Sequence, residues 1–239
     1  SFIASKHETP LRRIGLAGKF FASLVAVVSA LSLLGIIFDI ESLRSLPVST
    51  WVETDATLLF LYLLLGSAFI FKGRREAVWW QDVVIVISLA SLVTCFFKLF
   101  EIQPIKILET NQIVFGATNL DTSLGTHELL GMIAVNLSVL LFRVNQRVAT
   151  AVAGFSLLAA IVISYVGIAG FVYSAGVLQV LISSSVPATI NSAILLFLLA
   201  VAAFLNHPGQ EPVSTLASDT AGGTLSRSLI PAALIIPLV

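Results

Sequence analysis

The sequence predicts an all-α fold: a polytopic transmembrane helical bundle with hairpin-like repeats. Three observations lead to this prediction. Long apolar runs recur along the chain, the 239 residues are 57% hydrophobic and only 11% charged, and basic residues gather on alternate connections between the runs. Soluble domains carry about 25% charged residues, and a helix needs about 20 mostly apolar residues to cross a bilayer.

Each apolar run is expected to be a helix, because backbone in hydrocarbon must satisfy its own hydrogen bonds. The first run is too long for a cleavable signal peptide and is followed by more spans, so we expect an uncleaved insertion signal. The third run carries Trp79 and Trp80 at its start, where aromatic anchoring at the interface is expected. The runs are residues 17–39, 56–71, 77–97, 129–142, 148–173, 188–205 and 229–239.

Residues 1–239 are expected to form a single transmembrane domain with about seven helices. The last run is too short to span untilted, so we expect the sequence to be cut within or just after a seventh helix. An eighth helix would follow if the intact protein has a cytoplasmic C-terminal domain. We expect outer cap loops at 40–54, 98–128 and 173–187 and an inner loop at 206–228.

The distribution of basic residues predicts the orientation. With the N-terminus in the cytoplasm, most of the 13 Lys and Arg residues fall on inside segments, and the outside segments hold only Arg44, Lys98 and Lys106. Cytoplasmic loops carry this excess of positive charge. The formal net charge is zero, which argues against nucleic acid as a partner and leaves the lipid bilayer as the expected one.

Three helices that enter from the outside share a pattern. DATLLFLYLLLGSAFIF, GMIAVNLSVLLF and ATINSAILLFLLAVAAFL place Asp55, Asn136 and Asn191 near their outer ends, which suggests duplicated modules. These residues could simply cap helix N-termini, or they could also line a shared outer ligand cavity. Asn136 lies deeper than a simple cap, and polar groups inside membranes usually face the bundle interior.

Candidate cofactor and catalytic residues are few. His127 and Glu128 lie near a membrane rim and are a candidate ligand site, but a metal there would need further ligands such as Asp121 or Asp55. The lone Cys95 reads as a small apolar residue. No paired histidines for haem, no lysine for retinal and no nucleotide loop or catalytic triad is placed convincingly. We therefore expect no enzyme activity, no metal and no cofactor in this chain.

The inner segment TLASDTAGGTLSRSLIPAALIIP is the most distinctive part of the sequence. Ser218 or Asp219 could cap a short helix, and Gly222 and Gly223 permit a tight bend. Arg227 could anchor the chain at the inner surface. Pro231 falls in the first turns of the next helix, where proline is tolerated.

LASDTAGGTLSRSLIPAALIIPLV, with the upstream PATINSAILLFLLAVAAFLNHPGQ and DATLLFLYLLLG, resembles the polytopic membrane region at the N-terminus of bacterial sensor proteins. In that family the region precedes cytoplasmic PAS, histidine kinase or diguanylate cyclase domains. The resemblance implies a signal-input domain in the bacterial inner membrane, a homodimer, and a signal-coupling role for the inner segment. The family's Arg-Pro-Asp-Arg turn is replaced here by residues 207–210, His-Pro-Gly-Gln.

Three functions remain open at this point. The first is a sensor domain that passes a conformational change to a cytoplasmic output domain outside this chain. The second is an accessory subunit of a larger membrane complex that holds pigments or lipids, which the abundance of small residues would suit. The third is a transporter of a lipophilic solute, because repeats and Gly/Pro-interrupted helices occur in such proteins.

Overall fold

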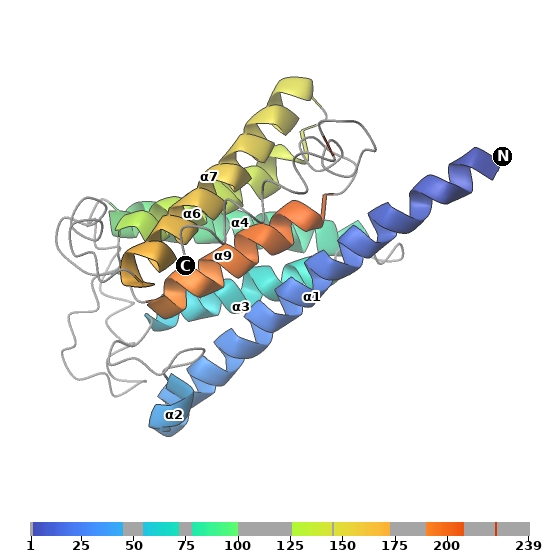
Figure 1. Cartoon of the computed structure of the whole chain (residues 1–239). Helices are drawn as coiled ribbons and strands as arrows, with labels where there is room; N and C mark the ends of the chain where they lie inside the picture. Colours follow the sequence, from blue (N-terminus) through green and yellow to red (C-terminus); the bar gives the residue numbers. More distant parts are fainter. Residues whose placement is uncertain are drawn as a thin grey trace.

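The computed structural model describes residues 2–44, 55–71, 78–99, 126–144, 146–172, 190–207 and 223. Within these ranges the chain is helical and contains no strand, which confirms the all-α prediction for this part (Figure 1). The helices are α1 (Phe2–Phe38), α2 (Glu41–Arg44), α3 (Ala56–Phe71), α4 (Val78–Leu99), α6 (Thr126–Leu141), α7 (Arg147–Val172) and α9 (Ile190–Leu205).

Helix boundaries follow the apolar runs closely, with two differences at the N-terminal end. Helix α1 begins at Phe2, well before the expected start at residue 17, and a short helix, α2, occupies the start of the expected outer loop 40–54. Apolarity marks where a helix can meet lipid, whereas the backbone hydrogen bonds of a helix continue through polar residues. The run at 229–239, the loop 173–187 and most of the loop 98–128 lie outside the described residues.

Helix α9 lies at the centre of the described bundle and contacts α1, α3, α6 and α7. Around it, α1 packs on α3, α3 on α4, α4 on α6, and α6 on α7. Figure 1 shows these helices running alongside one another, with the N-terminal turns of α1 projecting beyond the rest. Consecutive long helices run in opposite directions, so the three helices with the repeated pattern, α3, α6 and α9, all start at the same end.

Close helix contacts depend on glycine at two positions in the bundle. A Cβ on Gly18 of α1 would lie 3.1 Å from the backbone of Leu205 and Asn206, at the end of α9. A Cβ on Gly66 of α3 would lie 3.0 Å from the Ala22 carbonyl oxygen of α1. Small residues at such contacts let helix backbones approach closely, as they do between membrane helices.

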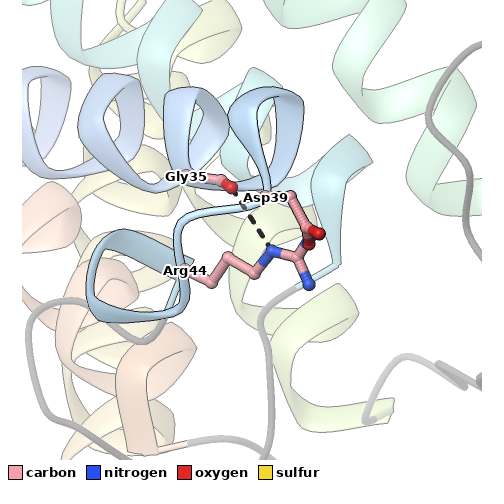
Figure 2. Close-up of polar contacts among 3 residues, drawn as sticks. All are labelled: Gly35, Asp39 and Arg44. Carbon is pink, nitrogen blue, oxygen red and sulfur yellow. Dashed lines mark hydrogen bonds and ion pairs between the residues drawn. The ribbon is translucent and has the colours of Figure 1, made fainter.

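The turn between α1 and α2 is held by a compact set of polar contacts (Figure 2). Asp39 has a positive φ of 58°, and the Ile40 N–H donates to the Gly35 carbonyl at 2.9 Å, which is the pattern of a Schellman cap. Arg44 Nε donates to the same Gly35 carbonyl at 3.3 Å, and its guanidinium pairs with Asp39. A Cβ on Gly35 would lie 2.6 Å from the Arg44 backbone nitrogen, so only glycine fits without a shift.

The outer surface of the described helices is strongly apolar. Phe20 of α1 is 66% exposed, Val86 of α4 is 65% exposed, and Val148 and Phe155 of α7 are 74% and 72% exposed. Fully buried positions include ten polar residues among those that the structure describes, although water-soluble proteins usually place polar side chains outside. They are Ser29, Ser32, Ser88, Ser91, Glu128, Asn136, Ser138, Ser164, Asn191 and Ser192.

Two described helical stretches are long and apolar enough to cross a membrane by length and composition: Ile14–Phe38, with 25 residues, and Arg147–Val172, with 26. Four further apolar helices are shorter, Ala56–Phe71, Asp82–Phe97, Glu128–Leu141 and Ile190–Leu205. A helix of 16 residues, such as α3, is about 24 Å long, which is less than the hydrocarbon thickness of about 30 Å.

Candidate functional site

A buried acid marks the end of the bundle where α3, α6 and α9 begin. Glu128 lies in the first turn of α6 and is only 3% exposed. The Ser192 hydroxyl on the first turn of α9 donates a hydrogen bond to Glu128 Oε1. A carboxyl group is rarely buried unless it has such a partner, so this contact fixes the starts of two helices together.

Tyr62 joins a third helix to this pair. Its side chain is fully buried in α3, and its hydroxyl donates to the Ser192 carbonyl oxygen at 3.3 Å. The hydroxyl also interacts electrostatically with Glu128 and with Cys95, which is buried on α4. We call Tyr62, Cys95, Glu128, Asn191 and Ser192 the outer polar cluster; it draws on four helices.

Asn191 lies near the start of its helix. It is fully buried in the first turn of α9, directly before Ser192. A capping residue on the rim of a bundle would be partly solvated, whereas Asn191 lies inside it. A buried amide provides hydrogen-bonding capacity in a low-dielectric setting, where such contacts are strong.

Asp55 acts as a helix cap. Its Oδ1 accepts hydrogen bonds from the backbone N–H groups of Thr57 at 2.7 Å and Leu58 at 3.2 Å. These are two of the N–H groups that a helix start leaves without an intrahelical partner. The capping interpretation of Asp55 is therefore confirmed, and Asp55 lies at the same end of the bundle as the outer polar cluster.

Asn136 lies deeper, about two turns along α6 from Glu128. It is fully buried, and its Nδ2 donates to Ser91 Oγ of α4 and to the Met132 carbonyl oxygen, each at 2.8 Å. The simple cap interpretation is wrong for Asn136, because a cap bonds the backbone N–H groups of the next turn, whereas this amide bonds a neighbouring helix. The three repeated polar residues thus have three different environments.

The remaining predicted site residues are described only in part. The backbone of His127 belongs to the first turn of α6, and its side chain lies outside the described residues, as does Asp121. Among the described residues, no group of three or more His, Cys, Asp or Glu side chains could hold a metal ion. Gly223 is helical and buried, and the other four residues of the predicted signal-coupling segment lie outside the described ranges: Asp219, Gly222, Arg227 and Pro231.

The opposite end of the bundle carries a second set of contacts. Phe142, just past the end of α6, stacks on the His207 ring with centroids 4.0 Å apart, and His207 Nδ1 lies 2.8 Å from the Ala203 carbonyl oxygen of α9. Arg143 approaches Asp82 of α4 at 3.9 Å, with both side chains largely solvent-exposed. His207, expected in an inner loop, thus closes the last turn of α9.

The sequence pointed to two members of the cluster, Glu128 and Asn191, but it did not indicate which residues pair with one another. Ser192 directly follows the candidate residue Asn191 in the sequence, but its bond to Glu128 joins residues 64 positions apart. Tyr62 carried no sequence signal beyond being the one phenol in its apolar run. The hydroxyl of a buried tyrosine usually finds a hydrogen-bond partner, and the position of this tyrosine in the middle of an apolar run is the signal that could have singled it out.

Comparison of the chain with protein-family models, curated proteins and solved structures gave no match. The resemblance to bacterial sensor regions therefore rests on the residues quoted for it alone, and any function must be argued from the geometry.

Proposed function

We propose that this chain is a membrane-embedded signal-input domain whose outer polar cluster receives the signal. The observation that carries the membrane part of the proposal is the apolar surface: many large apolar side chains are exposed, while ten polar residues are buried within the mostly apolar core of the described residues. Large exposed apolar patches are unusual on monomeric soluble proteins and mark interaction or membrane surfaces. In a bilayer this arrangement is expected, because polar groups turn to the bundle interior.

The shorter helices can also cross a membrane when the residues that flank them extend to the interface. Helices α3, α6 and α9 have 16 residues each, and a short hydrophobic segment can be accommodated by local bilayer thinning or by flanking residues that reach the interface. We propose that these helices cross the membrane together with α1, α4 and α7, giving a polytopic bundle.

The described charges support the proposed orientation. One end of the bundle carries mainly cations and the other mainly carboxylates, and cations favour the cytoplasmic side. We therefore propose an inner-membrane protein of bacterial type with its N-terminus in the cytoplasm. The first set is Lys19, Asp82, Arg143 and Arg147; the second is Asp39, Glu41, Arg44, Asp55 and Glu128.

The sensor role is supported by the way the cluster connects the helices. Glu128, Ser192 and Tyr62 link α6, α9 and α3 at one end. The far end of α9 leads toward the inner loop 206–228. A ligand or membrane change that favours one arrangement of the cluster over another would shift α9, and a shift of a packed helix is an established route of signal transfer. The resemblance to sensor proteins makes a kinase or cyclase the proposed output and a homodimer the proposed assembly.

The test begins with native mass spectrometry of the intact gene product, purified in mild detergent. The proposal requires a chain mass well above the 25.5 kDa of these 239 residues, a dimer, and a cytoplasmic output domain. A chain that ends near Val239 and carries pigments or partner proteins would instead favour the accessory-subunit function.

Output activity of the same protein then tests the cluster. Glu128→Gln and Ser192→Ala should change the response of the output domain by several-fold, because each alters the bond that links α6 and α9. Ser156→Ala is the matched control, since the Ser156 hydroxyl bonds only the Val152 carbonyl of its own helix among the described contacts. Equal output from all three variants would contradict the proposed role of the cluster.

A further inference from the structure

The contact between α4 and α6 is polar on both sides. Among the α4 residues whose burial is described, 82–97, the fully buried ones are Ser88, Ser91 and Cys95, which follow one another at helical spacing along one face. Asn136 of α6 bonds Ser91 across this contact, and Met132, also fully buried, lies one turn before Asn136 on the same face of α6. We call these five residues the α4–α6 seam. Several large apolar side chains of α4 are exposed, among them Val86, Leu89, Val93 and Phe96, whereas Val84 and Ile87 are partly buried against the core.

Two atoms in the seam are buried without a hydrogen-bond partner among the residues that the structure describes. They are Asn136 Oδ1 and Ser88 Oγ. Both hydrogens of the Asn136 amide are used, by Ser91 Oγ and by the Met132 carbonyl, so only the carbonyl oxygen of the amide lacks a partner. Native proteins rarely leave such groups unsatisfied, and each exception calls for an explanation such as a bound water.

The seam is closed in this structure, because both atoms are inaccessible to solvent. Separation of α4 from α6 would let water bond both atoms and would remove the penalty of leaving them unsatisfied. An apolar seam would gain nothing from the same movement. At the cytoplasmic end, the contact between the same two helices is the long, exposed Arg143–Asp82 pair, and exposed pairs of this kind hold helices together only weakly.

We propose that the α4–α6 seam is a gated water site, which opens when α4 moves away from α6 and places water between Asn136 Oδ1 and Ser88 Oγ. Water fits better than an ion because the five seam residues carry no charge and a bare ion in the bundle interior would be strongly disfavoured. The proposal does not depend on the signal-input function, since it uses no ligand of the outer polar cluster.

The chain contains one cysteine and one methionine, and both lie in the seam, so its opening can be followed without engineered labels. Cys95 should react with iodoacetamide, a small polar reagent, only while the seam is open, because alkylation requires a thiolate in contact with water. The alkylation rate in the full-length protein in lipid discs is read from intact mass.

The variants make the test specific. Ser88→Ala removes one unsatisfied atom and keeps the Asn136–Ser91 bond of the closed seam, so Cys95 alkylation should slow by about tenfold, the factor expected for one hydrogen bond recovered on opening. Ser91→Ala removes the partner of Asn136 in the closed seam and should speed alkylation. Ser164→Ala is the control, because the Ser164 hydroxyl is buried but bonds the Ala160 and Ile161 carbonyls of α7; it should leave the rate unchanged.

Equal alkylation rates in the parent, Ser88→Ala and Ser91→Ala would overturn the proposal, as would faster alkylation of Ser88→Ala. A second measurement uses Met132, which is fully buried. Brief X-ray radiolysis makes hydroxyl radicals from any water in place, so Met132 should be converted to its sulfoxide faster in Ser91→Ala, which favours the open seam, than in the parent. Equal or slower oxidation of Met132 in Ser91→Ala would also overturn the gated water site.

Discussion

The tight turn between α1 and α2 makes Gly35→Ala an informative substitution. An added Cβ would lie 2.6 Å from the Arg44 nitrogen and 2.7 Å from the Leu43 carbonyl carbon. Both are backbone atoms, so the contact cannot be relieved by rotating a side chain. Relaxation to an ordinary separation of about 3.5 Å requires α2 to move by about 1 Å. That movement strains the bond from Arg44 to Gly35, which is already 3.3 Å long.

The expected magnitude follows from two opposed effects. Alanine is better than glycine in a helix by roughly 0.5–1 kcal/mol, whereas overpacking against fixed atoms costs about 1–3 kcal/mol. Gly35→Ala should therefore lower the free energy of unfolding by about 1 kcal/mol. Gly15→Ala is the matched control on the same helix, because nothing lies within 4 Å of its Cβ position, and it should stabilise by roughly 0.5–1 kcal/mol.

Thermal unfolding of the two variants in one detergent gives the comparison. A chain of this size shifts in Tm by roughly 2–4 °C per kcal/mol, so Gly35→Ala should melt several degrees below Gly15→Ala. If Gly35→Ala melted at the same temperature as Gly15→Ala or above it, α2 would not be packed on α1 as described, and the argument from the close approach at Gly35 would fail.

Three further predictions concern the cap, the cluster and the surface. Asp55→Ala should destabilise by about 1 kcal/mol through loss of the cap while Asp55→Asn stays nearly neutral; thermal unfolding of the pair checks this, and equal losses would contradict it. Ser192→Ala should lower the free energy of unfolding more than Tyr62→Phe, because it leaves the buried Glu128 without one partner whereas the Tyr62 bond is long at 3.3 Å. Chemical denaturation should show a loss of roughly 1–3 kcal/mol for Ser192→Ala. A larger loss for Tyr62→Phe would be inconsistent with the cluster. Phe155→Asp should reduce the amount of protein in the membrane fraction, because a charge within a spanning helix costs roughly 2.5–3.5 kcal/mol. If insertion were unchanged, Phe155, which is 72% exposed on α7, would not face lipid.

Much of the described fold could be predicted because its signal is local. The run 56–71 coincides with α3, and the run 148–173 lies within one residue of α7 at each end, because apolar residues stop where the polar turns begin. The start of α1 at Phe2 could not be predicted in the same way. Hydropathy measures the affinity of side chains for lipid, so it does not report a helix that continues into polar sequence.

The candidate site was harder to predict because its contacts are not local. Capping was one of the two interpretations that the sequence offered for Asp55, and it could be predicted because capping involves only the next three residues. The environment of Asn136 depends on Ser91, 45 positions away, and no spacing rule within either helix encodes that pairing. A polar residue inside a membrane helix can be flagged from sequence, but its partner is set by the packing of the bundle.

The central place of α9 has a consequence for how the protein is made. Among the long helices that the structure describes, α9 leaves the ribosome last, yet it contacts four of the others and most of its residues are buried. The contacts of α1 with α9 join segments far apart in the sequence, and contacts of that kind form slowly. Until residue 205 has been synthesised, α1, α3, α6 and α7 lack their shared neighbour. Nascent chains truncated before α9 should therefore be the preferred substrates of membrane proteases.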